Sequence, residues 1–206
     1  MELVSSACAY IQAGGPVMWP LMAVSLWLWS LVLYKTLWLL SARRERLDLA
    51  QARRLLAEGG EPPVASGPRT AALGFFLSRR CGRLEADRRL WEVAVRHQAP
   101  QIWRHLTAIN VLAAVAPLLG LLGTVTGMID TFAVIQFHGT GNAQALAAGI
   151  SQALITTQTG LLVAIPGLFA SYTLRRQARK LQQGLYSFQR GLNLWLESQG
   201  RQACCA

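Results

Sequence analysis

Hydroxyl-bearing side chains are unusually frequent in a long apolar tract of this chain, from Leu106 to Leu174. The tract carries a single formal charge, Asp130. Its hydroxyl residues include Thr124, Thr126, Thr131, Ser151, Thr156, Thr157 and Thr159. Hydrocarbon offers a hydroxyl no hydrogen-bond partner, whereas a neighbouring helix or a polar path does. We therefore expect these residues to serve helix packing or the passage of ions within a helix assembly.

The polar residues of this tract fall into two depth layers. Counting at the helical rise from the midpoints of two expected spans places Thr124 roughly 4 Å and Thr157 roughly 7 Å toward the outer face. The same count places Asp130 and Gln152 about 13 to 14 Å outward. Matched layers are typical of a polar path, so these four residues are the candidate ion-pathway residues. For Asp130 and Gln152, a simple interfacial position is an equal alternative.

Small residues repeat at spacings of four and three in both spans. The second span has Ala113, Pro117, Gly120, Thr124, Gly127 and Thr131. The third has Ala153, Thr157, Gly160, Ala164, Gly167 and Ser171. Small residues let helices approach closely in a membrane, and Gly123 forms a G-x-x-x-G pair with Gly127. The predicted packing seam contains Gly120, Gly123, Gly127, Thr131, Gly160, Ala164 and Gly167.

The elements that carry these residues are all expected to be helices. About 20 apolar residues suffice to cross a bilayer, and three segments meet this length. The fold class is therefore an all-α membrane protein with three transmembrane helices, long cytoplasmic helical extensions and a helical homo-oligomeric assembly. The expected segments are an outer-side N-terminal segment (1–15), transmembrane helix 1 (16–40), a cytoplasmic Arg-rich helical loop (41–106), transmembrane helix 2 (107–137), an outer-side turn (138–148), transmembrane helix 3 (149–174) and a cytoplasmic helical tail (175–206).

Basic residues cluster beside the apolar runs. Thirteen of the twenty Lys and Arg residues lie between Arg43 and Arg104, and six more lie from Arg175 onward. Such clusters mark cytoplasmic segments, so we expect a periplasmic N-terminus and a cytoplasmic C-terminus. The net charge of +10 is explained by this distribution. Nucleic-acid binding is not expected, because no recognition motif accompanies the charge.

Within the cytoplasmic loop, 84–104 reads as a helix. We expect Leu90, Trp91, Val93 and Ala94 on its buried side and an interruption or bend at Pro100. Its many charges are expected to form a solvated face in contact with lipid headgroups.

The sequence contains no arrangement typical of an enzyme. The spans lack a Ser/His pair, paired Asp residues or a metal-binding helix, so we predict no catalytic residues, no metal and no cofactor. The four cysteines form no Cys-x-x-Cys pair. No acid or His lies at mid-membrane depth either. If protons or sodium ions move, a partner subunit must bring the titrating carboxylate.

Two motifs carry a family resemblance. Ala116-Pro-Leu-Leu-Gly-Leu-Leu-Gly-Thr-Val-Thr-Gly-Met128 resembles the second-span signature of the ExbB/TolQ/MotA proton-channel family, closer to ExbB and TolQ than to MotA. The segment Gly149-Ile-Ser-Gln-Ala-Leu-Ile-Thr-Thr-Gln-Thr-Gly-Leu-Leu-Val-Ala-Ile-Pro-Gly167 resembles its third-span signature. The match covers Ala116 to Gly167 closely, and the three-span layout covers the whole chain.

The resemblance implies a stator subunit of the bacterial inner membrane. It implies a pentamer around single-span ExbD-like partners that supply a proton-carrying Asp, and motion passed to a TonB-like protein in transport across the outer membrane. It also implies that Thr124 and Thr157 face the partner's Asp. ExbB and TolQ usually have Glu where this chain has Gln152, which cannot titrate. A TolQ-like role in envelope maintenance and cell division and a non-conducting membrane scaffold are the alternatives.

Overall fold

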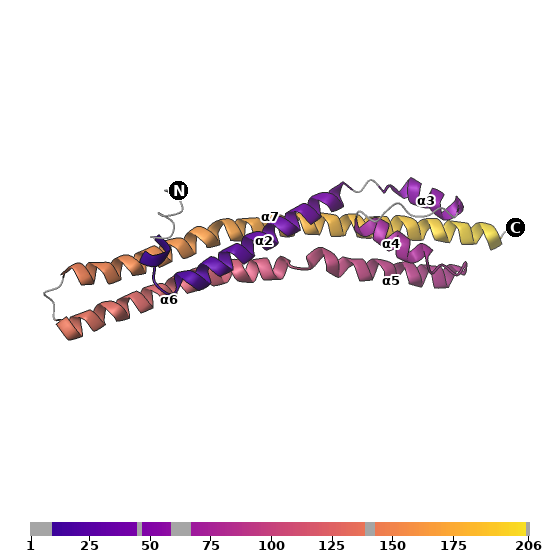
Figure 1. Ribbon diagram of the computed structural model, residues 1–206. Coiled ribbons are helices and arrows are strands. Elements are labelled where there is room, and N and C mark those ends of the chain that lie inside the picture. Colours follow the sequence, from indigo (N-terminus) through magenta and orange to yellow (C-terminus); the bar gives the residue numbers. More distant parts are fainter. Residues whose placement is uncertain (1–9, 45–46, 59–66, 139–142, 205–206) are drawn as a thin grey trace. The chain divides into compact units, whose positions relative to one another are not determined.

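The computed structural model describes residues 10–44, 47–58, 67–138 and 143–204. Within these ranges all regular structure is helical (Figure 1): α2 (Met18–Arg43), α3 (Leu49–Glu58), α4 (Pro68–Leu77), α5 (Leu84–Trp103), α6 (Leu106–His138) and α7 (Ala143–Cys204). The predicted all-α fold class is confirmed. Most of the predicted N-terminal segment, and residues 139–142 of the predicted outer turn, lie outside the described residues.

The chain divides into two compact units. Unit 1 comprises Met1–Leu33 and His105–Tyr172, and unit 2 comprises Tyr34–Arg104 and Thr173–Ala206. Helices α2 and α7 each contribute residues to both units, whereas α6 belongs to unit 1 and α3, α4 and α5 belong to unit 2.

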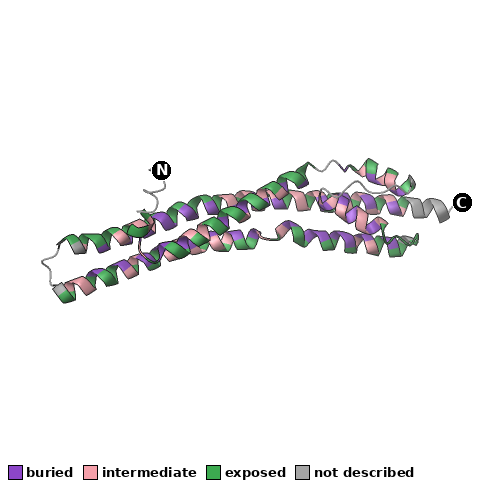
Figure 2. Ribbon diagram, viewed as in Figure 1, coloured by how far each residue is buried: buried purple, intermediate pink, exposed green. Residues whose placement is uncertain are grey.

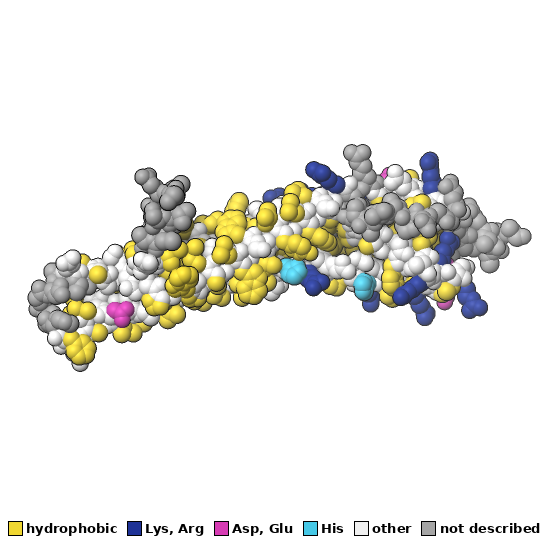
Figure 3. Space-filling view, in the orientation of Figure 1, with side chains coloured by type: hydrophobic (Ala, Val, Ile, Leu, Met, Phe, Trp, Pro, Cys, Tyr) yellow, Lys and Arg dark blue, Asp and Glu magenta, His cyan; other side chains and the backbone are white. Residues whose placement is uncertain are grey.

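Three helical segments are long and apolar enough to cross a membrane, and they lie within Met18–Arg43, Glu85–Phe137 and Leu146–Ser198. Their large apolar side chains are widely exposed, as at Trp19, Leu122 and Phe169. Figure 3 shows hydrophobic side chains gathered over the α2 and α6 region of unit 1. A water-soluble protein would bury such side chains, so these faces meet lipid or other subunits. The chain is a three-span membrane protein.

The core of unit 1 is the contact between α6 and α7, which lie side by side (Figure 1). Buried residues form one stripe along each helix (Figure 2). The other faces of these helices carry exposed apolar residues. Ala113 lies close to Gly167, whereas Thr131, further along α6, lies close to Gly149 near the start of α7. The two helices therefore run antiparallel.

Trp91 of α5 is the centre of the unit 2 core. Its fully buried ring makes edge contacts with Phe76 of α4 and Phe188 of α7, at centroid distances of 5.6 and 5.9 Å. The indole N–H donates to the carbonyl of Gln189 at 3.4 Å. A buried Trp needs such an acceptor, because its N–H would otherwise lose the hydrogen bond that water provides.

The buried side of α5 differs in part from the predicted one. Trp91 and Ala94 are buried as predicted, whereas Val93 is 53% exposed. The buried positions of this helix are Asp87, Trp91, Ala94, Val95, Gln98, Ala99 and Ile102. These positions recur every three or four residues, so they lie on one face of the helix. At about 100° of rotation per residue, Val93 lies about 160° around the helix from Trp91. The prediction for Val93 was wrong because it relied on the apolar side chain and not on its position around the helix.

Pro100 does not interrupt α5 as predicted. It lies inside the helix, which continues to Trp103, and the amide of Arg104 donates to the carbonyl of Pro100 at 3.0 Å. The helical path ends at Arg104, whose ψ is 136°, and His105 adopts a φ of +70°. A non-glycine residue in this left-handed region costs roughly 1–2 kcal/mol. The break between α5 and α6 therefore lies five residues after the proline.

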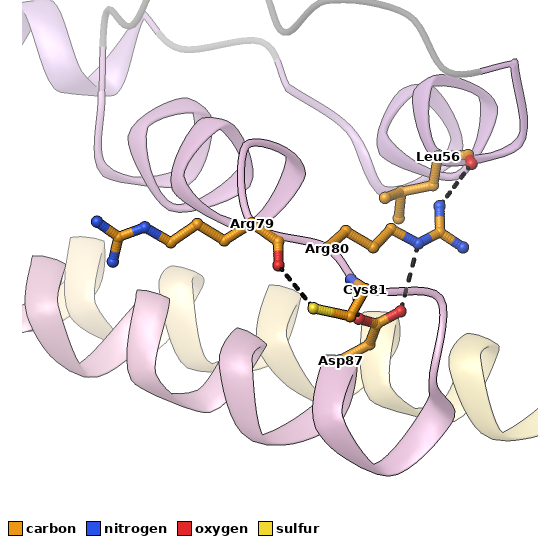
Figure 4. Close-up of polar contacts among 5 residues, drawn as sticks. All are labelled: Leu56, Arg79, Arg80, Cys81 and Asp87. Atoms are coloured by element: carbon orange, nitrogen blue, oxygen red, sulfur yellow. Dashed lines mark hydrogen bonds and ion pairs between the residues drawn. The ribbon is translucent and has the colours of Figure 1, made fainter.

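The turn between α4 and α5 is held by a buried carboxylate (Figure 4). Asp87 accepts a hydrogen bond from the Cys81 amide at 3.0 Å and pairs with Arg80 at 3.4 Å. Arg80 also donates to the carbonyl of Leu56 at 2.9 Å. One ion pair thus connects α3, the turn and the first helical turn of α5. Sequence reasoning missed this cluster, because Asp87 sits among many charged residues that are solvated.

Candidate ion-pathway site

The backbones of α6 and α7 approach each other closely at Gly120 and Gly160. A Cβ on Gly160 would lie 2.9 Å from the Ala116 carbonyl oxygen and 3.1 Å from the Gly120 Cα. A Cβ on Gly120 would lie 3.2 Å from the Thr157 Cα. Both contacts are with backbone, which cannot rotate away as a side chain can. Glycine at both positions therefore permits this close helix spacing.

Threonines fill the space beside two further glycines of the contact. A Cβ on Gly123 would overlap the Thr156 hydroxyl, and a Cβ on Gly149 would overlap the Thr131 hydroxyl. The seven predicted seam residues, from Gly120 and Thr131 on α6 to Gly167 on α7, are all buried. The predicted stripes differ from the buried ones at three positions. Pro117, Thr124 and Thr157 are half-buried, and the residue before each of them, Ala116, Gly123 or Thr156, is buried instead.

Thr124 and Thr157 lie at the edge of the helix contact. Gly123 lies against Thr156, and Gly120 lies against Thr157, so Thr124 and Thr157 occupy neighbouring levels of the helix pair. Both are half-buried. Residues one turn away are exposed, including Leu121 beside Thr124 and Leu161 beside Thr157. Each hydroxyl therefore stands where the buried contact meets an open face of its helix.

The hydroxyls of Thr124 and Thr157 both donate to their own helices. Thr124 Oγ1 donates to the carbonyl of Leu121 at 2.7 Å. Thr157 Oγ1 lies 3.1 Å from the Ala153 carbonyl and 3.0 Å from that of Leu154. A hydroxyl that donates its proton to the backbone keeps its oxygen lone pairs. Both threonines can therefore accept a hydrogen bond from a group on the open face.

Gln152 and Asp130 have different surroundings. Gln152 is half-buried, and its side-chain amide occupies the space that a Cβ on Gly15 would need. Gly15 has a φ of +71°, where glycine is favoured. Asp130 is exposed on α6. No side-chain hydrogen bond joins Asp130 to Gln152 among the residues that the structure describes.

Two polar contacts of unit 1 were not anticipated. The Tyr10 hydroxyl lies 3.4 Å from Thr159 Oγ1, so the segment before α2 contacts α7. The Ser171 hydroxyl lies 3.4 Å from Asn110 Oδ1, between α7 and α6. Asn110 is a polar residue at the start of a span, which could have marked it as a helix-helix contact. Tyr10 lies far from Thr159 in sequence and gave no such signal.

These features define a class of protein: a polytopic helical membrane protein whose second and third spans form a tight antiparallel pair edged by hydroxyls. The model of the MotA/TolQ/ExbB proton channel family matches residues 69–186. That match covers more than half of the chain, and the chain belongs to this family. The three apolar helices and the family membership together indicate a multi-pass protein of the inner membrane.

Individual relatives carry ExbB names. The chain is 34% identical to a putative biopolymer transport protein ExbB-like 1 of Synechocystis sp., over 74% of this chain and 64% of the relative. It is 38% identical to a biopolymer transport protein exbB1 of Vibrio cholerae, over 52% and 46%. It is 36% identical to a biopolymer transport protein ExbB of Xanthomonas campestris, over 60% and 45%. The chain thus spans about half to two thirds of the length of these relatives.

Proposed function

We propose that this chain is an ExbB-like stator subunit of a proton-driven motor in the inner membrane, which energises TonB-dependent transport across the outer membrane. The observation that carries the proposal is the placement of Thr124 and Thr157 at neighbouring levels of the α6–α7 pair, each with an open acceptor oxygen. The ExbB names of the relatives support the transport role.

The proposed chemistry assigns the moving proton to a partner. Asp130 is the sole formal charge from Leu106 to Leu174, and it is exposed near the outer end of α6 on the depth count. A single-span ExbD-like protein with an intramembrane Asp would bring the titrating group. When that carboxyl is protonated, its O–H can donate to a threonine oxygen of this chain, and when it is ionised it needs water or other donors instead.

The proposed assembly is a homo-oligomer, with five subunits implied by family resemblance. One three-span chain is too small to enclose a path for ions. The exposed apolar faces that flank Thr124 and Thr157 suit contact with further copies or with a partner helix. The proposed orientation has the N-terminus in the periplasm and unit 2 with the C-terminus in the cytoplasm, because Arg and Lys concentrate in unit 2.

The test is proton flux through the chain co-expressed with an ExbD-like partner and reconstituted in liposomes. We expect Thr124→Ala and Thr157→Ala each to lower the flux by at least about tenfold, the equivalent of roughly 1.4 kcal/mol for a lost hydrogen bond to the carboxyl. Thr126→Ala is the matched control, because Thr126 is half-buried on the same helix and its hydroxyl donates to the Gly123 carbonyl.

Two outcomes would contradict the proposal. Wild-type flux in both threonine variants would remove these residues from the path, and no flux in the wild-type complex would favour a scaffold. Rescue of siderophore uptake in a strain lacking ExbB and TolQ supports the TonB role. Rescue of envelope integrity alone would assign the chain to the TolQ-like alternative.

A further inference from the structure

A polar contact lies at the inner end of the α6–α7 pair, the end away from Asp130. The Ser171 hydroxyl donates to Asn110 Oδ1 at 3.4 Å. Ser171 is 1% exposed, whereas Asn110 is half-buried. The Asn110 side chain therefore extends from the buried helix contact to the edge of α6.

This contact repeats the arrangement of Thr124 and Thr157. Asn110 precedes Thr124 by fourteen residues, and Ser171 follows Thr157 by fourteen. An α-helix departs from an exact seven-residue repeat by only about 20° per repeat, so each residue lies within about 40° of its threonine around the helix. Because the two helices are antiparallel, both shifts lead toward the same end. The second polar pair thus lies on the same side of the α6–α7 pair, roughly 21 Å further in.

Asn110, Pro117 and Thr124 form a row along one edge of α6, which we call the edge row. They are spaced by seven residues, and all three are half-buried. Ala114 and Leu121, which neighbour the row on the helix surface, are exposed. The whole row therefore follows the line where the buried contact meets the open face of α6.

Pro117 adds a backbone acceptor to the edge row. A proline has no N–H, so it cannot donate to the carbonyl four residues earlier, which is that of Ala113. No side chain of the described residues donates to this carbonyl either. A freed carbonyl within a span needs a neighbouring donor or an ordered water. It lies between Thr124 and Asn110, so water here would connect the two polar ends of the row.

Asn110 keeps hydrogen-bond donors for water. Its amide oxygen accepts from Ser171, and its amide nitrogen carries two N–H donors. No residue of the described ranges accepts from this nitrogen, which is not one of the fully buried polar atoms that lack a partner. The nitrogen is therefore accessible, and it can donate to water at the edge of α6.

The depth of Asn110 suits an opening to the aqueous side. Counted from the span midpoints, Asn110 lies roughly 17 Å and Ser171 roughly 14 Å inward. Half of the hydrocarbon core of a bilayer is about 15 Å. Thr107, about one turn beyond Asn110, is exposed. The edge row thus extends from Thr124, near the middle of the bilayer, to the inner headgroup level.

We propose that the edge row is a water-filled inner half of the ion path and that Asn110 positions water at its cytoplasmic end. The proposal rests on the proposed function, because it needs a partner carboxyl that releases its proton beside Thr124. That proton passes to water, and each water then accepts one proton and donates one toward the cytoplasm. Asn110 does not titrate, so it is a positioning residue.

The first test is proton flux through the full-length complex with its ExbD-like partner in liposomes. We expect Asn110→Leu to lower the flux by about tenfold, because leucine fills a similar volume but holds no water. Asn110→Ser should stay within about threefold of the wild type, because its hydroxyl can bind water. A packing role predicts the reverse order, since serine would leave a gap that leucine fills.

The second test measures water at Asn110 without relying on flux. The same complex, with its four native cysteines replaced by Ser, carries Asn110→Cys and is treated in inverted membrane vesicles with a charged methanethiosulfonate. We expect labelling of this thiol from the cytoplasmic side, followed as a mass shift of the intact chain.

Leu112→Cys is the matched control for labelling. Leu112 is half-buried like Asn110 but lies on the opposite edge of the buried stripe of α6, two heptads from Thr126. It should react at least about tenfold more slowly, because charged reagents and thiolates avoid hydrocarbon. Leu112→Ala should also leave the flux unchanged.

The outcomes separate this proposal from the proposed function. Equal labelling at positions 110 and 112, or wild-type flux in Asn110→Leu, would overturn the role of the edge row and leave the function of Thr124 and Thr157 standing. Selective labelling at position 110 in a complex without proton flux would support a water-filled row but contradict the proposed function, and with it the role of Asn110 in ion passage.

Discussion

Single residues determine how close α6 and α7 can come, and Gly160 is the most sensitive of them. We expect Gly160→Ala to lower the free energy of unfolding by about 1–3 kcal/mol, because the added methyl meets the Ala116 carbonyl and the Gly120 Cα. Chemical unfolding in mixed micelles, followed by circular dichroism, measures the change.

Gly191→Ala on the same helix is the control for this substitution. There the added methyl meets only the end of the Leu49 side chain, which can move. Alanine also favours a helix over glycine by up to about 1 kcal/mol. Gly191→Ala should therefore be neutral or stabilising. Equal effects of the two substitutions would show that helix propensity, and not the close approach, governs Gly160.

The sequence predicted the stripes of small residues in α6 and α7 but not every buried position within them. The spacing of small residues identified the stripes, because close packing in a membrane depends on residue size. It could not decide between the neighbouring Thr156 and Thr157 for the buried position, since both are threonines and differ by one helical step. The fully buried Thr156 and the half-buried Thr157 were distinguished only by the contacts of α6 with α7.

Whether Gln152 takes part in an ion path stays a prediction. The depth count grouped it with Asp130, but depth says nothing about the direction in which a side chain points around the helix. In the structure Gln152 lies against Gly15, before α2, and Asp130 is exposed on α6. An amide can make such a contact although it does not titrate.

At the scale of elements, the Arg80–Asp87 ion pair determines how α3, α4 and α5 are joined. Asp87 is 3% exposed and also accepts from the Cys81 amide. We expect Arg80→Gln to lower the free energy of unfolding by roughly 1–3 kcal/mol, because it leaves a buried carboxylate without its cation. Unfolding of the purified full chain, followed by circular dichroism, is the measurement.

Arg88→Gln is the control for this ion pair. Arg88 pairs with Glu197 at 3.1 Å, but both side chains are more exposed, at 53% and 35%. Exposed pairs contribute roughly 0–1 kcal/mol, so Arg88→Gln should have little effect. An equal loss in both variants would mean that the burial of Asp87 does not strengthen its ion pair.

Helix positions were easier to predict than helix ends. Long apolar runs fixed α2, α6 and the first part of α7, since their length and composition admit few alternatives. The proline in α5 pointed to Pro100 as the break, yet the helix ends at Arg104 and the unusual φ lies at His105. A proline removes one backbone donor and adds one local clash, and tertiary packing of the buried Ile102 can retain the helix past it.

At the scale of the whole molecule, the distribution of charge predicts the orientation in the membrane. Nineteen of the twenty basic residues lie from Arg43 to Arg104 or from Arg175 onward. We expect a C-terminal green fluorescent protein fusion after Ala206 to fluoresce, because the positive-inside rule predicts that this end is cytoplasmic. Alkaline phosphatase inserted after Gly141 should be active, because the same rule predicts that the link between the second and third spans is periplasmic.

Alkaline phosphatase inserted after Gly67 is the control and should be inactive, since the Arg-rich loop is predicted to stay in the cytoplasm. Activity at this site, or a dark C-terminal fusion, would contradict the orientation. The subunit number and the partners depend on surfaces that are buried only in the assembly, so no single residue of the chain determines them.

The contact between Gly120 and Gly160 also has a consequence for evolution. Each glycine faces backbone of the other helix, so no substitution on the opposite helix can make room for a larger residue. Gly123 faces the side chain of Thr156, and there a smaller partner could offset a larger residue. Among homologues that keep this helix crossing, we expect Gly120 and Gly160 to remain unchanged, while positions 123 and 156 vary together.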